Sequence, residues 1–224
     1  MDLALRLRSG LGLGLCSMSG ALAISAGESA TNLQGAMASR ANAARLSAAQ
    51  ALQQRSPYVL TPERKALLNT IRYAEGTWRD GEAEGYRVLY GGDTFDSFEK
   101  HPERVIVKRY TSAAAGAYQF LPRTWSMAAA KLGLGDFGPR NQDQAALFLI
   151  ERRKALTEAD AGKLTPQLLA KLAPEWASLP TLAAKSYYGQ PVKKAKDLQR
   201  FYQRNLENLR RQANGSGPLR LRLS

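Results

Sequence analysis

The chain between residues 61 and 212 carries apolar residues at helical spacing, and the start of this region is well marked. We expect a first helix over residues 63–75. Thr61 is a typical N-cap, Pro62 suits the first helical position, and Gly76 suits the stop that follows a helix. This pattern predicts that a folded domain, the catalytic domain if the chain is an enzyme, begins at residue 61.

Glu75 ends the apolar stripe of this first helix. Leu68, Ile71 and Glu75 stand at positions i, i+3 and i+7, so their side chains share one face. Glutamate is seldom buried without a reason. Glu75 is therefore a candidate catalytic acid, with an ordinary solvated residue at a helix end as the alternative.

The rest of the domain is expected to hold two short strands and several further helices. The strands are expected at 86–90 and 105–107, with a turn at 91–93 between them. The helices are expected over 116–131 with Gly133 as its stop, over 141–156 opened by an Asn141/Gln144 capping pair, after Thr165-Pro166, and over 192–212. Many helices with one small antiparallel sheet are typical of the α+β class.

The two ends of the chain differ in composition from this domain. Residues 1–26 place Arg6 and Arg8 before a short apolar stretch and small residues, which predicts a signal peptide and an exported protein. The stretch is shorter than the roughly 20 apolar residues of a membrane span. Residues 27–60 are rich in Ala, Ser and Gln and are expected to form a linker, and residues 213–224 a flexible basic tail.

Charge and composition limit the kinds of partner and of catalytic group that the chain can have. The chain has 32 Lys+Arg against 19 Asp+Glu, a net charge of +13, which predicts an anionic partner. Loss of residues 1–26 removes two arginines and one aspartate, which lowers the net charge by one to +12. A single Cys and a single His exclude a disulfide framework and a His/Cys metal site. We therefore expect no metal and no cofactor, and carboxylates as the acid–base groups.

Several short strings follow one another in order between residues 62 and 208. They include RYAEGT at 72–77, GYRV at 85–88, HP at 101–102, TSAAAGAYQ at 111–119, EWASLP at 175–180 and YGQ at 188–190. In this order the chain resembles the lambda-type endolysins, muramidases of the lysozyme-like superfamily. The resemblance implies a lysozyme-like fold, with the small sheet beside an active-site cleft. It also implies cleavage of the β-1,4 bond between N-acetylmuramic acid and N-acetylglucosamine in peptidoglycan.

The resemblance places the catalytic acid at Glu75. Packing against Leu68 and Ile71 would raise the pKa of this carboxyl, so that it could donate a proton near neutral pH. Lambda-type enzymes are lytic transglycosylases, in which the same glutamate then takes a proton from the muramic 6-hydroxyl. That hydroxyl closes onto the anomeric carbon and leaves a 1,6-anhydro end without consuming water.

Two other mechanisms or functions stay open. A hydrolysing lysozyme would need a second carboxylate, and the loop after Glu75 offers Glu82 and Glu84 as candidates. Glu84 has the nine-residue spacing of the hydrolysing phage lysozymes, whereas matching their Glu-Gly-Tyr string selects Glu82. The remote alternative is a non-enzymatic basic module that binds wall polymer or nucleic acid. Aromatic residues at core spacing argue against it.

The remaining site residues rest on side-chain chemistry or on the family strings. Gln119 offers a donor and an acceptor suited to an acetamido sugar. The other substrate-binding candidates are Tyr90, Tyr118 and Tyr188, which could equally belong to the core, and Ser178 and Gln190, which rest on the strings alone. His101 is expected to brace a loop, and Trp125 and Trp176 to pack in the core. We expect glycan strands and anionic envelope polymers as partners, no nucleic acid, no membrane span, and a monomer.

Overall fold

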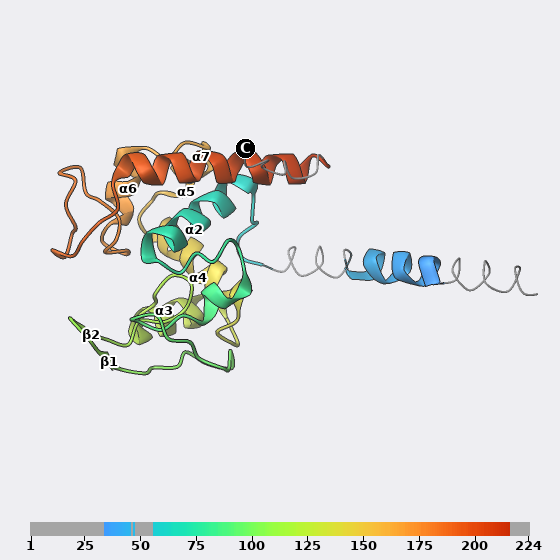
Figure 1. Cartoon of the computed structure of the whole chain (residues 1–224), viewed down its shortest axis with the longest axis horizontal. Helices are drawn as coiled ribbons and strands as arrows, with labels where there is room; N and C mark the ends of the chain where they lie inside the picture. The colour runs from blue at the N-terminus through green and yellow to red at the C-terminus, as the bar shows by residue number, and fades with distance from the viewer. Residues whose placement is uncertain (1–33, 46, 48–55, 216–224) are drawn as a thin grey trace, which may run out of the picture. The chain divides into compact units, whose positions relative to one another are not determined.

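The structure, a computed structural model, describes residues 34–45, 47 and 56–215. The chain divides into two compact units, residues 1–52 and residues 53–224. The described part of the first unit is a helix over residues 34–45 (Figure 1).

The second unit is mostly helical with one small sheet. Its elements, in chain order, are α2 (Pro62–Glu75), the 3-10 helix η1 (Ala83–Arg87), β1 (Ile106–Val107), β2 (Thr111–Ser112), α3 (Pro122–Leu132), α4 (Pro139–Arg152), α5 (Leu156–Asp160), α6 (Pro166–Leu172) and α7 (Ala195–Ala213). The α+β class expected from the sequence is confirmed.

The local signals around α2 act as predicted. The Thr61 hydroxyl accepts a hydrogen bond from the Arg64 backbone N–H at 3.3 Å, and Pro62 opens the helix. Gly76 ends it in the left-handed conformation, with φ of 76°. A side chain at that φ would be strained, so glycine suits the position. These caps fix the residue at which α2 stops, and that residue is Glu75.

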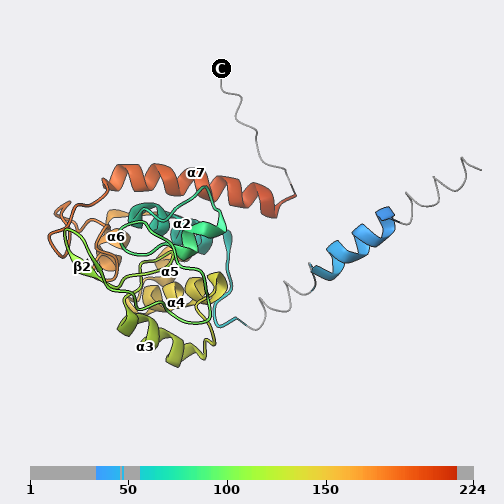
Figure 2. The ribbon, with the colours of Figure 1, turned by 60° about the horizontal axis from the view of Figure 1, so that its bottom comes forward.

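Helix α7 lies along α2 and covers one side of it (Figure 1). The Tyr73 and Phe201 rings stack with centroids 4.4 Å apart, and the Asn69 side chain donates to that of Asn205 at 2.8 Å. Helix α4 contacts α2 on another side, with α3 beyond it (Figure 2). The buried face of α7 consists of Leu198, Tyr202 and Leu206.

The small sheet differs in part from the prediction. β1 and β2 pair antiparallel, with Ile106 opposite Ser112, within the strand region expected at 105–107. The strand expected at 86–90 is wrong: residues 83–87 form η1, and Val88 and Leu89 make only isolated bridges. The backbone at Gly85 passes so close to the Thr77 carbonyl that a Cβ would collide with it. This tertiary contact favours a tight turn there over an extended strand.

Two helix starts also differ from the prediction. The helix expected over 116–131 begins only at Pro122, although Gly133 ends it as expected. The Asn141/Gln144 capping pair is wrong, because α4 starts at Pro139. The Asn141 amide donates to Asp136, and the Gln144 side chain donates to the Tyr58 carbonyl at 3.0 Å. Asn141 therefore bonds the turn just before α4, whereas Gln144 makes a tertiary contact with the segment before α2.

Packing extends a few residues into the segment expected as linker. Tyr58 is buried in the core, and its backbone N–H donates to Gln144 Oε1 at 2.8 Å. Residues 1–26, expected as a signal peptide, and residues 216–224 of the expected tail lie outside the described residues. In the described part of the chain, no helix is both long and apolar enough to cross a membrane.

Candidate active site

A cavity of about 610 Å³ opens at the C-terminal end of α2. Cavities of this size are typical of ligand sites. Glu75 contributes from α2, Thr111 and Ser112 from β2, and Arg152 from the end of α4. The sheet therefore lies beside the cavity, as the fold predicted from the sequence requires. The cavity is also lined by Tyr90, Gln119, Glu175, Trp176, Tyr188 and Gln190.

Glu75 is partly buried in this cavity and has one close side-chain partner. The Ser178 hydroxyl donates to Glu75 Oε1 at 2.6 Å. Burial raises the pKa of Glu75 from its ordinary 4.5 to about 7, and hydrogen bonds from the Ser178 side chain and backbone counter part of that rise. Burial disfavours the charged form of a carboxyl. Glu75 can therefore carry a proton near neutral pH and give it to a bound group.

The segment that carries Ser178 is fixed by the neighbouring core. Trp176 is buried, and its indole N–H donates to the Tyr118 carbonyl at 3.2 Å. The Lys193 backbone N–H donates to the Ser178 carbonyl at 3.2 Å. Trp176 therefore packs in the core, as predicted, and it also fixes the segment that brings Ser178 to Glu75.

Gln119 lines the cavity in a left-handed conformation, with φ of 47°. Its amide donates to the Val88 and Gly116 carbonyls, both at 3.1 Å. A non-glycine residue at positive φ is uncommon and is often found at functional sites. The two donated bonds fix the side chain, and they leave its carbonyl oxygen as the acceptor for a ligand.

The three tyrosine candidates differ in what their hydroxyls do. Tyr90 and Tyr188 line the cavity, and the exposed Tyr188 donates to the Pro174 carbonyl at 2.7 Å. Tyr118 also borders the cavity, but its ring is buried and its hydroxyl donates to Asp143 Oδ1 at 2.5 Å. The Tyr118 side chain therefore packs in the core, and its hydroxyl is bonded to Asp143.

Asp143 is a partly buried carboxylate that the sequence reasoning did not select. It accepts hydrogen bonds from the Tyr86 hydroxyl at 2.8 Å and from the Tyr118 hydroxyl. Burial raises the pKa of Asp143, and the two hydroxyls and the nearby Arg72 counter that rise. The partners lie 57 and 25 residues away in the chain, so no local pattern could have revealed the cluster.

The two loop carboxylates proposed as partners of Glu75 are not among the lining residues. Glu82 and Glu84 are exposed. The other carboxylate on the cavity wall is Glu175. Its Oε1 forms an ion pair with Arg153 Nε at 2.8 Å, and its side chain is 10% exposed. The sequence reasoning missed Glu175 and Arg153 as cavity residues, since helix α4 and the 174–180 segment meet only in the folded chain.

His101 and Trp125 are structural residues, as predicted. His101 is buried; its Nδ1 accepts from the Glu103 backbone N–H at 3.1 Å, so its Nε2 donates to the Phe120 carbonyl at 2.8 Å. Burial lowers the pKa of His101, which keeps the ring neutral. Trp125 packs against Phe137 in the core. In the residues that the structure describes, no group of three or more His, Cys, Asp or Glu could hold a metal ion.

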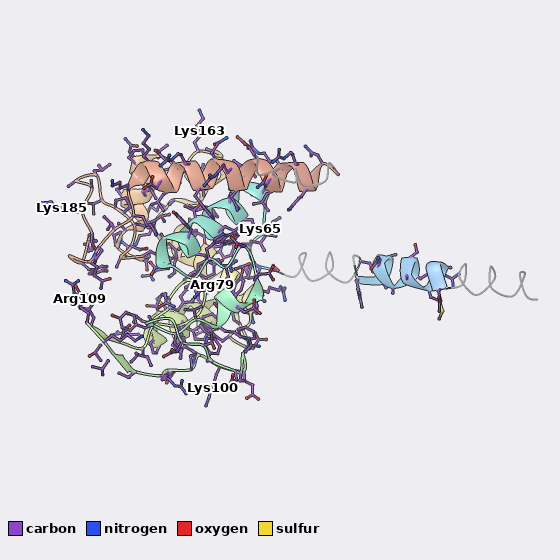
Figure 3. All side chains as sticks on the ribbon, viewed as in Figure 1. Lys65, Arg79, Lys100, Arg109, Lys163 and Lys185 are labelled. Atoms are coloured by element: carbon purple, nitrogen blue, oxygen red, sulfur yellow. The ribbon has the colours of Figure 1, made fainter. Side chains whose placement is uncertain are left out.

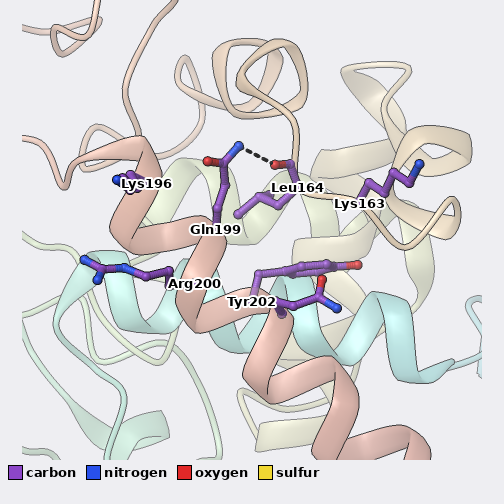
Figure 4. Close-up of a pocket in the computed structure, with 7 residues that line it drawn as sticks. Lys163, Leu164, Lys196, Gln199, Arg200 and Tyr202 are labelled. Atoms are coloured by element: carbon purple, nitrogen blue, oxygen red, sulfur yellow. Dashed lines mark hydrogen bonds between the residues drawn. The ribbon is translucent and has the colours of Figure 1, made fainter.

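A second cavity, of about 370 Å³, lies at the start of α7 and shares no lining residue with the Glu75 cavity. Figure 4 shows Lys163, Lys196 and Arg200 around it, with Gln199 donating to the Leu164 carbonyl at 2.9 Å. None of its lining residues is acidic. The charged residues that line it are therefore all cationic.

Comparisons with known proteins relate this chain to endolysins. The family model described as Endolysin matches residues 65–209. The endolysin of Escherichia phage lambda is 36% identical over 141 residues, which cover 61% of this chain and 86% of that protein. The endolysin of Escherichia phage P2 is 32% identical over 129 residues, with coverage of 51% and 78%.

Solved structures give the same result for the fold. The bacteriophage lambda lysozyme complexed with a chitohexasaccharide superposes with a TM-score of 0.60 and 33% identity, covering 65% of this chain and 95% of that one. A second structure, of lysozyme from bacteriophage lambda, gives a TM-score of 0.57 and 30% identity. The chain therefore belongs to the endolysin family and is a lysozyme-like muramidase.

Proposed function

We propose that this protein is a lytic transglycosylase. It cleaves the β-1,4 bond between N-acetylmuramic acid and N-acetylglucosamine in peptidoglycan, and Glu75 acts first as acid and then as base. The observation that carries the proposal is the partly buried Glu75 carboxyl on the wall of a cavity of about 610 Å³, with its pKa raised to about 7.

A carboxyl with that pKa suits both halves of the reaction. Its acid form donates a proton to the leaving glycosidic oxygen, and the carboxylate formed then accepts a proton from the muramic 6-hydroxyl. The hydroxyl oxygen bonds to the anomeric carbon as the proton leaves, so a 1,6-anhydro ring forms and no water enters. The Ser178 hydroxyl, 2.6 Å from Oε1, supports the carboxylate between the two steps.

The placement of the other carboxylates favours this chemistry over hydrolysis. An inverting or retaining glycosidase needs a second carboxylate across the bond, and the exposed Glu82 and Glu84 do not line the cavity. Glu175 does line it. A hydrolysing mechanism would therefore draw on Glu175, which Arg153 holds in an ion pair.

We further propose Gln119, Tyr90, Tyr188 and Gln190 as substrate-binding residues, because all four line the cavity. The solved lambda lysozyme was complexed with a chitohexasaccharide, which supports glycan strands as the ligand. The Tyr118 ring is buried against Asp143, so Tyr118 positions the wall of the site.

Export through a signal peptide at residues 1–26 would bring the enzyme to its substrate. Lysines and arginines project from many sides of the second unit (Figure 3), and Lys163, Lys196 and Arg200 surround the cavity at the start of α7. With a net charge of +12 after loss of the leader, attraction to anionic envelope polymers is expected, and salt would weaken it.

Mass spectrometry of the fragments released from purified peptidoglycan tests the proposal. A lytic transglycosylase gives fragments with 1,6-anhydromuramic ends. Reducing ends, heavier by one water, would instead identify a hydrolase. Digestion in ¹⁸O-labelled water provides the internal control, because only hydrolysis introduces the label.

A further inference from the structure

A third cavity, of about 450 Å³, lies between α2, the loop after it and α7, and it shares only Tyr118 with the Glu75 cavity. We propose that this cavity binds a short peptide ending in a free carboxylate, and that Arg72 holds the carboxylate. The catalytic proposal does not use Arg72, and of the residues that line this cavity it uses only Tyr118 and Asp143, which shape the wall of the Glu75 site.

Arg72 is a buried cation whose hydrogen bonds are incomplete. Its residue is 2% exposed, and its Nη2 donates to the Glu82 carbonyl at 3.1 Å. Its Nε is buried with no hydrogen-bond partner in the described chain. No carboxylate among the described residues lies within ion-pair distance of its guanidinium. The Asp143 carboxylate is near enough for Arg72 to lower its pKa but forms no direct ion pair with the guanidinium. A buried charge without a direct partner is costly, and a bound carboxylate would supply one.

Neighbouring groups fix the position of the Arg72 guanidinium. It lies over the Tyr86 ring at 4.4 Å and over the Trp78 ring at 5.0 Å from the ring centroids. A Cβ at Gly85 would lie 2.6 Å from Arg72 Nη2, so only glycine leaves room for the group. A planar guanidinium fixed in this way is suited to paired hydrogen bonds with a carboxylate.

The remaining wall fits a peptide better than a bare ion. Lys65 adds a second, exposed cation, and the Trp78 indole offers a flat apolar face. The side-chain amides of Asn208 and Gln212 line the cavity and can donate to and accept from peptide groups.

Two acidic residues, Asp80 and Asp143, also line this cavity. Asp143 already accepts both tyrosine hydroxyls, and Asp80 lies in the exposed loop, where it can accept a peptide N–H. A cavity of about 450 Å³ holds more than an inorganic ion needs.

The source of such a peptide follows from the substrate class. Peptidoglycan carries short stem peptides that end in free carboxylates. In this proposal, Arg72 holds the carboxylate of one stem peptide while a glycan strand lies at Glu75. This identification rests on the proposed function. Recognition of the carboxylate itself rests only on the cavity and on Arg72.

Isothermal titration of the full chain with acetyl-L-lysyl-D-alanyl-D-alanine tests the inference. We expect saturable binding that weakens about tenfold or more when the peptide is amidated at its C-terminus, because one charge-assisted pair is lost. Arg72→Met should weaken binding by a similar factor and Lys65→Met by about threefold. Arg104→Met, at an exposed arginine that lines none of the three cavities, is the matched charge control and should bind like the wild type.

Three results would overturn the inference: no saturable binding, equal binding of the acid and the amide, or equal binding by the wild type and a folded Arg72→Met. Binding of inorganic phosphate as tightly as the peptide would overturn the peptide class. Circular dichroism checks the fold of each variant, and the exposed Lys65 gives a variant with little folding risk. Binding by Glu75→Gln should persist, which separates this inference from the catalytic proposal.

Discussion

Replacing Glu75 by glutamine should stabilise the protein at high pH while leaving its low-pH stability unchanged. Burial raises the folded-state pKa of this carboxyl to about 7, above its ordinary 4.5. The folded state therefore holds the proton more tightly than the unfolded chain. The stability gained from this is present below about pH 4.5 and is lost as the pH rises through about 7.

The size of this effect follows from the same shift. A difference between 4.5 and about 7 corresponds to an upper bound of about 3 kcal/mol. Because the side chain is partly open to the cavity, we expect about 1–3 kcal/mol after screening by solvent. Glutamine keeps an oxygen that can accept from Ser178, and it carries no charge at any pH.

Urea unfolding at pH 4, 6 and 8 measures the free energy of unfolding of both proteins. The variant should match the wild type at pH 4 and exceed it by about 1–3 kcal/mol at pH 8. Glu84→Gln, at an exposed glutamate, is the matched control and should show no comparable growth with pH. A difference for Glu75→Gln that stays flat, or that shrinks with rising pH, would refute the desolvation of Glu75.

Three further variants test other parts of the site. Ser178→Ala removes the donor that favours the carboxylate, so the alkaline limb of the activity profile should move up by about 1 pH unit, and an unmoved limb would contradict this. Gly116→Ala should cost about 2–4 kcal/mol in thermal unfolding, because φ is 80° and the new Cβ would collide with the Gln142 amide; a loss below about 1 kcal/mol would speak against that contact. The double variant Glu82→Gln with Glu84→Gln should clear peptidoglycan suspensions at the wild-type rate, whereas inactivity of the folded double variant would restore a two-carboxylate mechanism.

Signals carried by neighbouring residues were sufficient to predict several elements. Thr61, Pro62 and Gly76 set both ends of α2, since capping depends on residues within one turn. Thr165 likewise caps α6 by accepting from the Leu168 backbone N–H at 3.1 Å. The apolar stripe of α7 followed from its helical spacing for the same reason.

Signals that depend on distant contacts misled the prediction. Residues 86–90 have strand-forming composition, but contacts at Gly85 favour a 3-10 turn just before Val88. Asn141 and Gln144 have capping spacing, but α4 begins at Pro139 and Gln144 bonds the distant Tyr58. Tertiary contacts overrode local preference at residues 86–90 and at Gln144.

In the candidate site too, some residues could be selected from the sequence, whereas their contacts could not. Glu75 could be selected from its position on an apolar helix face, and the family strings pointed to Ser178. Their hydrogen bond joins residues 103 positions apart, which no local pattern encodes. The ion pair of Glu175 with Arg153 and the buried Arg72 are also products of the fold. These groups emerged only when the packing of the helices was known.

Turnover of purified peptidoglycan by Glu75→Gln tests the catalytic role of Glu75 most directly. The amide cannot deliver a proton to the leaving oxygen or take one from the 6-hydroxyl, so we expect a loss of at least about a thousandfold. The unfolding measurements on the same variant show whether it is folded. Release of anhydromuramic fragments at a near-wild-type rate by folded Glu75→Gln would contradict the assignment of Glu75 as the acid and base of the reaction.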